Sequence, residues 1–97
     1  MVETVPFDLA KYLRRPEFAA EYLDGLLNEG DIAEIHSGIR DLVRAYGVAT
    51  VAESTGLSRE AIYRAFGPKG NPSLGTLLIV LKAVGVKLSV AVKHDSH

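Results

Sequence analysis

The side chains best suited to recognise a ligand lie in residues 58–64, Ser-Arg-Glu-Ala-Ile-Tyr-Arg. Arranged as a helix, this segment turns its apolar side chains inward and presents Arg59, Glu60 and Arg64 outward. An arginine can donate two hydrogen bonds to guanine at once, and a glutamate can accept a hydrogen bond from cytosine. These residues therefore predict a surface that reads the edges of DNA bases.

The residues around this segment have the spacing of a helix-turn-helix, in which two helices are joined by a turn of three or four residues. The first helix needs a small residue where the second crosses it, and Ala52 meets that need. Gly56 follows four residues later and tolerates the positive φ of the turn. Ile62, ten residues after Ala52, then packs the second helix onto the first. The alternative is an ordinary helical hairpin with a glycine turn, which has the same spacing and no affinity for DNA.

Other polar residues are suited to the phosphates of a DNA backbone. Thr50 starts the first helix, and Lys69 and Asn71 lie in a turn-rich loop after the second. The candidate DNA-binding residues are Thr50, Ser58, Arg59, Glu60, Tyr63, Arg64, Lys69 and Asn71. Residues 40–70 hold five basic and three acidic side chains, so we expect one copy to bind with modest, salt-sensitive affinity.

The sequence offers little for catalysis. There is no cysteine, and three histidines (His36, His94 and His97) have neither the spacing of a catalytic triad nor a glycine-rich phosphate loop near them. We expect His36 to be partly buried and hydrogen-bonded, and the two terminal histidines to bind metal only adventitiously. The predictions are therefore no enzyme activity, no cofactor and no metal site.

The chain is long enough for one domain, and its charge is divided unevenly along it. Residues 1–34 hold eight acidic and three basic residues, a net charge of −5, whereas residues 35–97 hold eight basic and four acidic residues, a net charge of +4. This asymmetry suggests that the two ends meet different partners, although chance clustering on solvated faces would look the same. With no apolar run near the ~18 residues of a membrane span and no basic leader, we expect a cytoplasmic protein.

Helices must position these side chains. Apolar residues at helical spacing, with caps and glycine stops, predict helices over 16–29, 31–46, 48–55, 58–66 and 73–84, after a short helical turn that carries Tyr12. The last helix should turn Leu74, Leu77, Leu78 and Leu81 to one face. Because its apolar face is wider than a simple stripe, it is either central to the core or part of a subunit contact.

After Gly85 the apolar period changes from helical spacing to two. Val86, Leu88, Val90 and Val92 alternate with more polar residues, which predicts a half-buried strand. No other segment is predicted as a strand, so its backbone must pair elsewhere, most simply with the same strand of a second copy. Leu88, Val90 and Val92 are therefore the candidate dimerisation residues. The alternative is a frayed tail.

Two motifs together resemble a known family. Residues 56–65 are similar to a TGLSRE-x-[LI]-Y-[KR]-A signature, and Gly70-Asn71-Pro72 with the following helix and strand is similar to a second family element. With the N-terminal segment, the match resembles the HigA-like addiction-module antidote proteins, which carry a Cro/C1-type (XRE-family) helix-turn-helix. Residues 66–69 depart from the pattern, as does Gly38, which should soften its helix by about 1 kcal/mol.

The resemblance implies a mainly α fold: a five- to six-helix bundle of lambda-repressor-like helix-turn-helix type, with a short C-terminal strand that pairs between subunits. We divide the chain into an acidic N-terminal helical extension (1–34), the helix-turn-helix domain (35–85) and a strand and tail (86–97).

It also implies an antitoxin that forms homodimers, neutralises a RelE/ParE-like toxin and represses the promoter of its own operon by binding double-stranded operator DNA. Because such toxins are usually basic, the acidic extension is the candidate toxin-facing part, with Phe7 and Tyr12 as aromatic anchors. Phe18 and Tyr22 are expected in the core. Two alternatives remain: a stand-alone helix-turn-helix regulator without a toxin, and a protein-binding adaptor that has lost DNA affinity.

Overall fold

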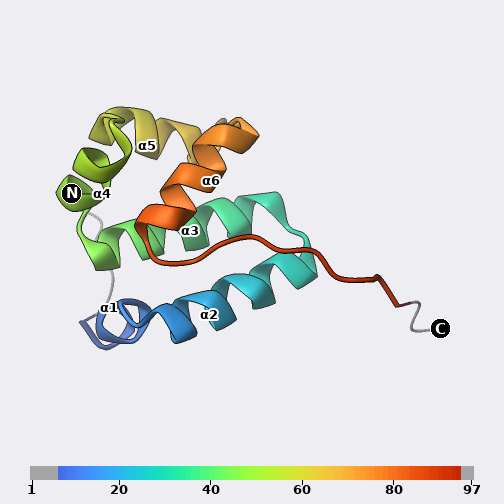
Figure 1. Ribbon diagram of the computed structural model, residues 1–97. Helices are drawn as coiled ribbons and strands as arrows, with labels where there is room; N and C mark the ends of the chain where they lie inside the picture. The colour runs from blue at the N-terminus through green and yellow to red at the C-terminus, as the bar shows by residue number, and fades with distance from the viewer. Residues whose placement is uncertain (1–6, 95–97) are drawn as a thin grey trace.

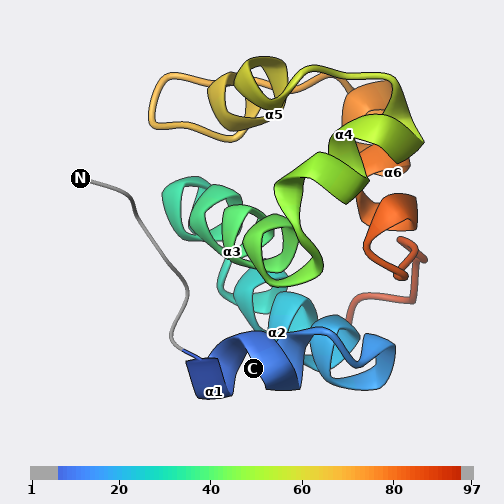
Figure 2. The ribbon, with the colours of Figure 1, turned by 90° about the vertical axis from the view of Figure 1, so that its left-hand side faces the viewer.

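The computed structural model describes residues 7–94, which form six helices and no strand. The helices are α1 (Phe7–Leu13), α2 (Pro16–Glu29), α3 (Ile32–Tyr46), α4 (Val48–Thr55), α5 (Arg59–Ala65) and α6 (Leu74–Ala83). They are stacked in three levels, with α1 and α2 on one side of α3 and the other three helices on the opposite side (Figures 1 and 2). Helix α3 packs against α1, α2 and α4, so it is the centre of the fold. The predicted mainly α architecture is confirmed.

The ends of the helices follow from local sequence. Asp31, Ser58 and Ser73 each accept a hydrogen bond from a backbone N–H in the first turn of α3, α5 and α6, which satisfies a donor that the helix itself leaves unpaired. Gly30 and Gly56 end α2 and α4 in the left-handed conformation, with φ of 78° and 77°. The predicted bounds of these helices are accordingly correct to within a residue or two. The proposed division between residues 34 and 35 falls inside the first turn of α3.

The core is built around one face of α3. Its buried side chains include Ile39, Leu42 and Val43, which are at most 1% exposed. The other levels contribute the remaining core residues, which include Leu13, Ala19, Leu23, Val51, Ile62, Phe66, Val80, Leu81 and Val84. Ile32, at helical spacing from Ile35 and Ile39, is nevertheless 62% exposed because it occupies the first position of α3.

Gly38 lies where α2 and α3 pack against each other. It is buried, and a Cβ at this position would meet the side chain of Leu26 and lie 3.4 Å from Cε2 of Tyr22. The sequence indicated only that a glycine would soften α3. The structure adds that its missing side chain lets the two helices approach closely.

Helix α6 lies at the surface with one face covered. Val80, Leu81 and the following Val84 are buried, and the helix packs on α4. Leu74 and Leu78, expected on the inner face, are 66% and 42% exposed. The prediction was wrong for these two leucines because, among the described helices, α6 packs mainly on α4 and its wide apolar face is not fully enclosed.

The segment after α6 does not form the predicted strand within the single chain. Residues 86–94 have no regular secondary structure, and none of the described residues lies beside them as a strand. A strand is defined by hydrogen bonds to a neighbour, so an isolated one cannot form. Val86 and Leu88 pack against the core, whereas Val90 and Val92 are 98% and 79% exposed. The alternating apolar stripe is thus covered at its start and open at its end.

Between residues 7 and 94, every helix is too short or too polar to cross a bilayer.

Candidate nucleic-acid interface

A turn of three residues, 56–58, joins α4 to α5, and several hydrogen bonds hold it in one conformation. The hydroxyl of Thr55 donates to the carbonyl oxygen of Val51 at 2.8 Å and accepts from the N–H of Leu57 at 3.2 Å. The hydroxyl of Ser58 then accepts from the N–H of Ala61 at 3.0 Å and starts α5. These local hydrogen bonds restrain the backbone of the turn and so the direction in which α5 leaves α4.

Helix α5 is attached by one buried residue and presents the rest of its surface. Ile62 is fully buried, and the alanines on either side of it are half-buried. The exposed or half-buried residues are those predicted from the sequence: Ser58, Arg59, Glu60 and Arg64 are exposed, and Tyr63 is half-buried. The first turn of α5 therefore carries a guanidinium and a carboxylate that are both accessible to a ligand.

The remaining candidates lie on neighbouring elements. Lys69 and Asn71 are exposed on the loop that follows α5, and Thr50 is exposed on the first turn of α4. Seven of the eight predicted DNA-binding residues thus lie between positions 58 and 71, on α5, its cap and its loop, while Thr50 stands apart on the preceding helix.

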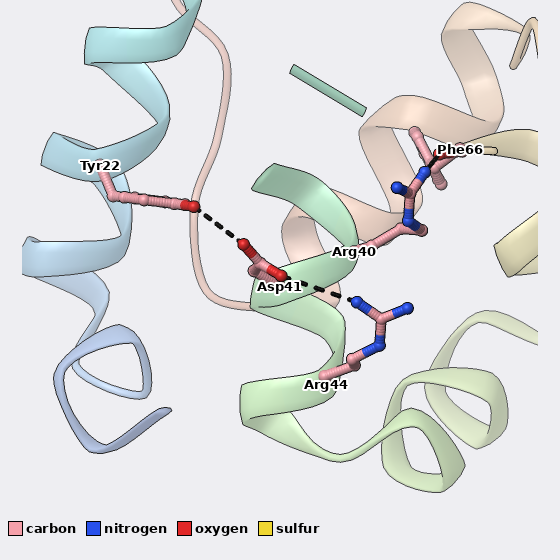
Figure 3. Close-up of polar contacts among 5 residues, drawn as sticks. All are labelled: Tyr22, Arg40, Asp41, Arg44 and Phe66. Atoms are coloured by element: carbon pink, nitrogen blue, oxygen red, sulfur yellow. Dashed lines mark hydrogen bonds and ion pairs between the residues drawn. The ribbon is translucent and has the colours of Figure 1, made fainter. Parts of the chain in front are cut away.

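Two side chains of α3 hold the loop after α5. Arg40 donates to the carbonyl oxygen of Phe66, as Figure 3 shows, and Nδ1 of His36 lies 3.3 Å from the carbonyl oxygen of Gly67. Because a carbonyl oxygen only accepts, Nδ1 must carry the proton. The ring of Phe66 is fully buried and meets His36 edge-on, with 5.7 Å between ring centroids. The predicted hydrogen bond of His36 is confirmed, and the side chain is more deeply buried than the partial burial that the sequence indicated. Phe66, one of the residues at which the sequence departs from the family pattern, is thus part of the core.

Gly70 brings this loop back against the end of α5. A Cβ on Gly70 would collide with the carbonyl oxygens of Arg64 and Ala65. The loop can therefore close onto the helix only with glycine at this position, and this closure places Lys69 and Asn71 beside α5.

A chain of polar contacts leads from α2 through α3 to α5, and sequence reasoning missed it. The hydroxyl of Tyr22 donates to Asp41 at 3.0 Å, and Asp41 forms an ion pair with Arg44 at 3.6 Å (Figure 3). The guanidinium of Arg44 lies 5.3 Å from the centre of the Tyr63 ring. Burial, together with the hydrogen bond to Asp41 and its negative charge, raises the pKa of Tyr22 to about 12. The i,i+3 spacing of Asp41 and Arg44 was the only sequence signal for these contacts.

A second surface lies at the corner between α1 and α2. The ring of Tyr12 is 38% exposed and stacks on Phe18, with 4.3 Å between centroids and 9° between planes. Arg15 lies 4.9 Å from the centre of the Phe18 ring. The Tyr12 hydroxyl donates to Glu21 at 3.0 Å, and this hydrogen bond is the main cause of a raised pKa for Tyr12. Phe7 begins α1, but its side chain lies outside the described part of the structure.

This corner belongs to an acidic surface. Among the described residues before position 35, every carboxylate is exposed: Asp8, Glu17, Glu21, Asp24, Glu29, Asp31 and Glu34. Phe18 and Tyr22, expected in the core, are only half-buried. Tyr22 packs against the core and reaches Asp41 with its hydroxyl, whereas the Phe18 ring lies against Tyr12 and Arg15 at the surface. The N-terminal helices therefore combine negative charge with partly exposed aromatic rings.

These features define a small helical protein with an accessible polar helix at one side and an acidic, aromatic surface at the other. Residues 3–92 match a family described as probable addiction module antidote proteins, and the chain belongs to that family. An uncharacterized protein of Haemophilus influenzae strain Rd is 36% identical to it over 84 residues, which cover 87% of each chain. No solved structure matches. Membership identifies an antitoxin of an addiction module, which implies a toxin of some kind as partner.

Proposed function

We propose that this protein is a homodimeric antitoxin that neutralises a RelE/ParE-like toxin and represses its own operon through α4 and α5. The observation that carries the DNA-binding part is the exposure of α5. Ile62 anchors the helix, while Arg59, Glu60 and Arg64 are left open to a major groove. Two copies would read a two-fold symmetric operator and add to each other's affinity.

The contacts behind α5 support this role. Arg40 and His36 hold the backbone just after the helix, and Arg44 lies against Tyr63. A recognition surface needs side chains held in place before the ligand arrives, because ordering them on binding costs affinity. The half-buried Tyr63 serves as the fixed edge of that surface.

The acidic surface supports the toxin part of the proposal. The exposed carboxylates of α1 and α2 would attract a basic toxin and accelerate its association. Tyr12 is a rigid aromatic side chain held on Phe18, and partly exposed aromatic rings of this kind often provide much of the binding energy in protein interfaces. Because its hydroxyl is already bound to Glu21, the ring rather than the hydroxyl is the group offered to a partner.

The DNA-binding part is tested by titrating DNA from upstream of the gene and following fluorescence anisotropy at two stated salt concentrations. Arg59→Ala and Arg64→Ala should each weaken binding about 5- to 150-fold, the equivalent of ~1–3 kcal/mol per base contact. Arg14→Ala is the matched control, since it removes the same charge from an exposed position just after α1. If all three variants bind as tightly as the parent, α5 is not the recognition helix. If the parent shows no preference for this DNA, the protein-binding adaptor is the better description.

The toxin part is tested with the product of the neighbouring gene, expected to be a basic protein. Tyr12→Ala should lower the affinity of the complex about 30-fold or more, as expected for an aromatic anchor worth ~2 kcal/mol. Tyr12→Phe is the control because it keeps the stacked ring and removes only the hydroxyl. If Tyr12→Ala binds the toxin as tightly as Tyr12→Phe and the parent, Tyr12 is not part of the interface. If no toxin gene lies beside this one, the stand-alone regulator is favoured.

A further inference from the structure

We infer that a second copy of this chain inserts Val90 and Val92 into the groove between α2 and residues 86–89. The inference rests on the proposed homodimer and deepens it by naming the surface that receives the second copy.

The groove is lined by both apolar and polar side chains. Its volume is about 370 Å³, and its apolar lining includes Leu23 and Leu27 of α2 together with Leu88. Leu27 is 42% exposed although it borders the core. The full lining is Ala20, Glu21, Leu23, Asp24, Leu27, Val86, Lys87, Leu88 and Ser89. A chain that enters this groove can therefore bury apolar side chains on α2 and pair its backbone with residues 86–89.

The C-terminal segment itself has the side chains that fit. Val86 and Leu88 line the groove and pack against the core, and the alternation continues through Val90 and Val92, which are 98% and 79% exposed. Residues spaced by two lie on the same face of an extended chain, so these four side chains form one apolar stripe. Its first two residues are covered by the core and its last two are exposed. In a two-fold pair each copy can cover the end of the other, because such an interface uses the same patch twice.

One register of the antiparallel pair both covers the exposed valines and keeps the lysines apart. With Ser89 opposite Ser89 of the second copy, Leu88 faces Val90, and Val86 faces Val92, so each exposed valine meets a residue of the groove. Lys87 then faces Ala91. A register with Val90 opposite Val90 would instead set Lys87 directly opposite Lys93, and like charges in directly opposed positions are destabilising.

Hydrogen bonding agrees with this arrangement. The N–H of Val86 donates to the carbonyl oxygen of Leu81 at 3.0 Å and so points toward α6. Backbone groups alternate in direction along an extended chain, which turns the N–H groups of Lys87 and Ser89 to the other side, where a second strand can pair. Val86 and Leu88 then occupy non-hydrogen-bonded positions, where opposed side chains are closest.

Cysteine cross-linking tests the register, since the protein has no cysteine of its own. Leu88→Cys and Val90→Cys proteins are oxidised with diamide, separately and after mixing. The expected result is a disulfide-linked dimer in the mixture, where position 88 of one copy faces position 90 of the other. Either sample alone should give little dimer, because the same position in the two copies is displaced by about two residues along the pair, beyond the ~7 Å between Cα atoms that a disulfide can bridge. Ser54→Cys mixed with Val90→Cys is the control for random collision. A dimer from Val90→Cys alone, or none in the mixture, would overturn the register.

A matched pair of leucines tests the groove. Leu27 in the groove and Leu78 on α6 are both 42% exposed, so aspartate at either position should leave the fold intact. Leu78 lies on the apolar face of α6, the other candidate subunit contact, so the pair of variants tests one surface against the other. By light scattering, Leu27→Asp should be monomeric at concentrations where the parent and Leu78→Asp are dimeric. A dimeric Leu27→Asp protein, or loss of the dimer in both variants, would overturn the inference, as would a monomeric parent. If Leu27→Asp stays dimeric, binds operator DNA and loses only the toxin, the groove belongs to the toxin and the proposed function stands. If the parent binds neither DNA nor toxin, the proposed function fails whatever the cross-linking shows.

Discussion

Replacing Gly70 with alanine should destabilise the protein even though alanine is usually the more favourable residue. The new Cβ would collide with the carbonyl oxygens of Arg64 and Ala65 at the end of α5. These are backbone atoms, so the loop itself must move, and forcing an extra methyl group into a packed site costs ~1–3 kcal/mol. The lower entropy of the unfolded chain with alanine returns ~0.4–1 kcal/mol. We therefore expect a net loss of about 1–2 kcal/mol.

Thermal unfolding followed by circular dichroism measures this loss. For a chain of this length, 1 kcal/mol corresponds to a change in Tm of ~4–8 °C, so Gly70→Ala should lower Tm by about 4–16 °C. Gly25→Ala is the matched control, since Gly25 lies in α2 with nothing within 4 Å of the position of a Cβ. It should raise Tm by a few degrees, because alanine in an exposed helix is favoured by ~0.5–1 kcal/mol.

The two glycine variants separate the packing argument from the propensity argument. If Gly70→Ala melts at or above the Tm of the parent, the closure of the loop onto α5 does not depend on glycine, and our reasoning about this position is refuted. Under the proposed function, Gly70→Ala should also weaken operator binding at temperatures where it remains folded, because Lys69 and Asn71 lie on the displaced loop. Gly25→Ala should leave operator binding unchanged.

Three further predictions follow from the core and from the polar contacts. The pKa of Tyr22 is about 12 in the folded protein and 10 in the unfolded chain, so the stability that its neutral form contributes is complete below pH 10 and is lost as the pH rises through 12. In an absorbance titration, Tyr22→Phe should therefore remove a tyrosine that ionises near pH 12, and an unchanged titration above pH 11 would contradict this. Phe66→Ala should cost ~3–5 kcal/mol in urea unfolding, since the ring is fully buried, and a loss below 1 kcal/mol would show that the site collapses around the cavity. Ser73→Ala should cost about 1 kcal/mol by removing the cap that accepts from the N–H of Thr76, and Ser73→Asp should retain most of that stability.

Local sequence determined most of the secondary structure. The caps at Asp31, Ser58 and Ser73 and the left-handed glycines at 30 and 56 act within three or four residues of themselves, so their effect can be recognised without knowledge of the rest of the chain. The outward face of α5 could be predicted for the same reason, because helical periodicity relates buried Ile62 directly to its exposed neighbours. That these exposed residues contact DNA remains a prediction.

Only the tertiary structure decided the features that depend on residues far apart in the sequence. Arg40 and the buried Phe66 hold the end of α5 across 26 positions, and Tyr22 reaches Asp41 across 19. A sequence pattern shows that a side chain is polar or apolar, but which helix will cover it depends on packing between distant elements. The C-terminal stripe shows the same limit: its alternation was evident from the sequence, whereas only the fold places its first two residues on α2 and leaves Val90 and Val92 in solvent.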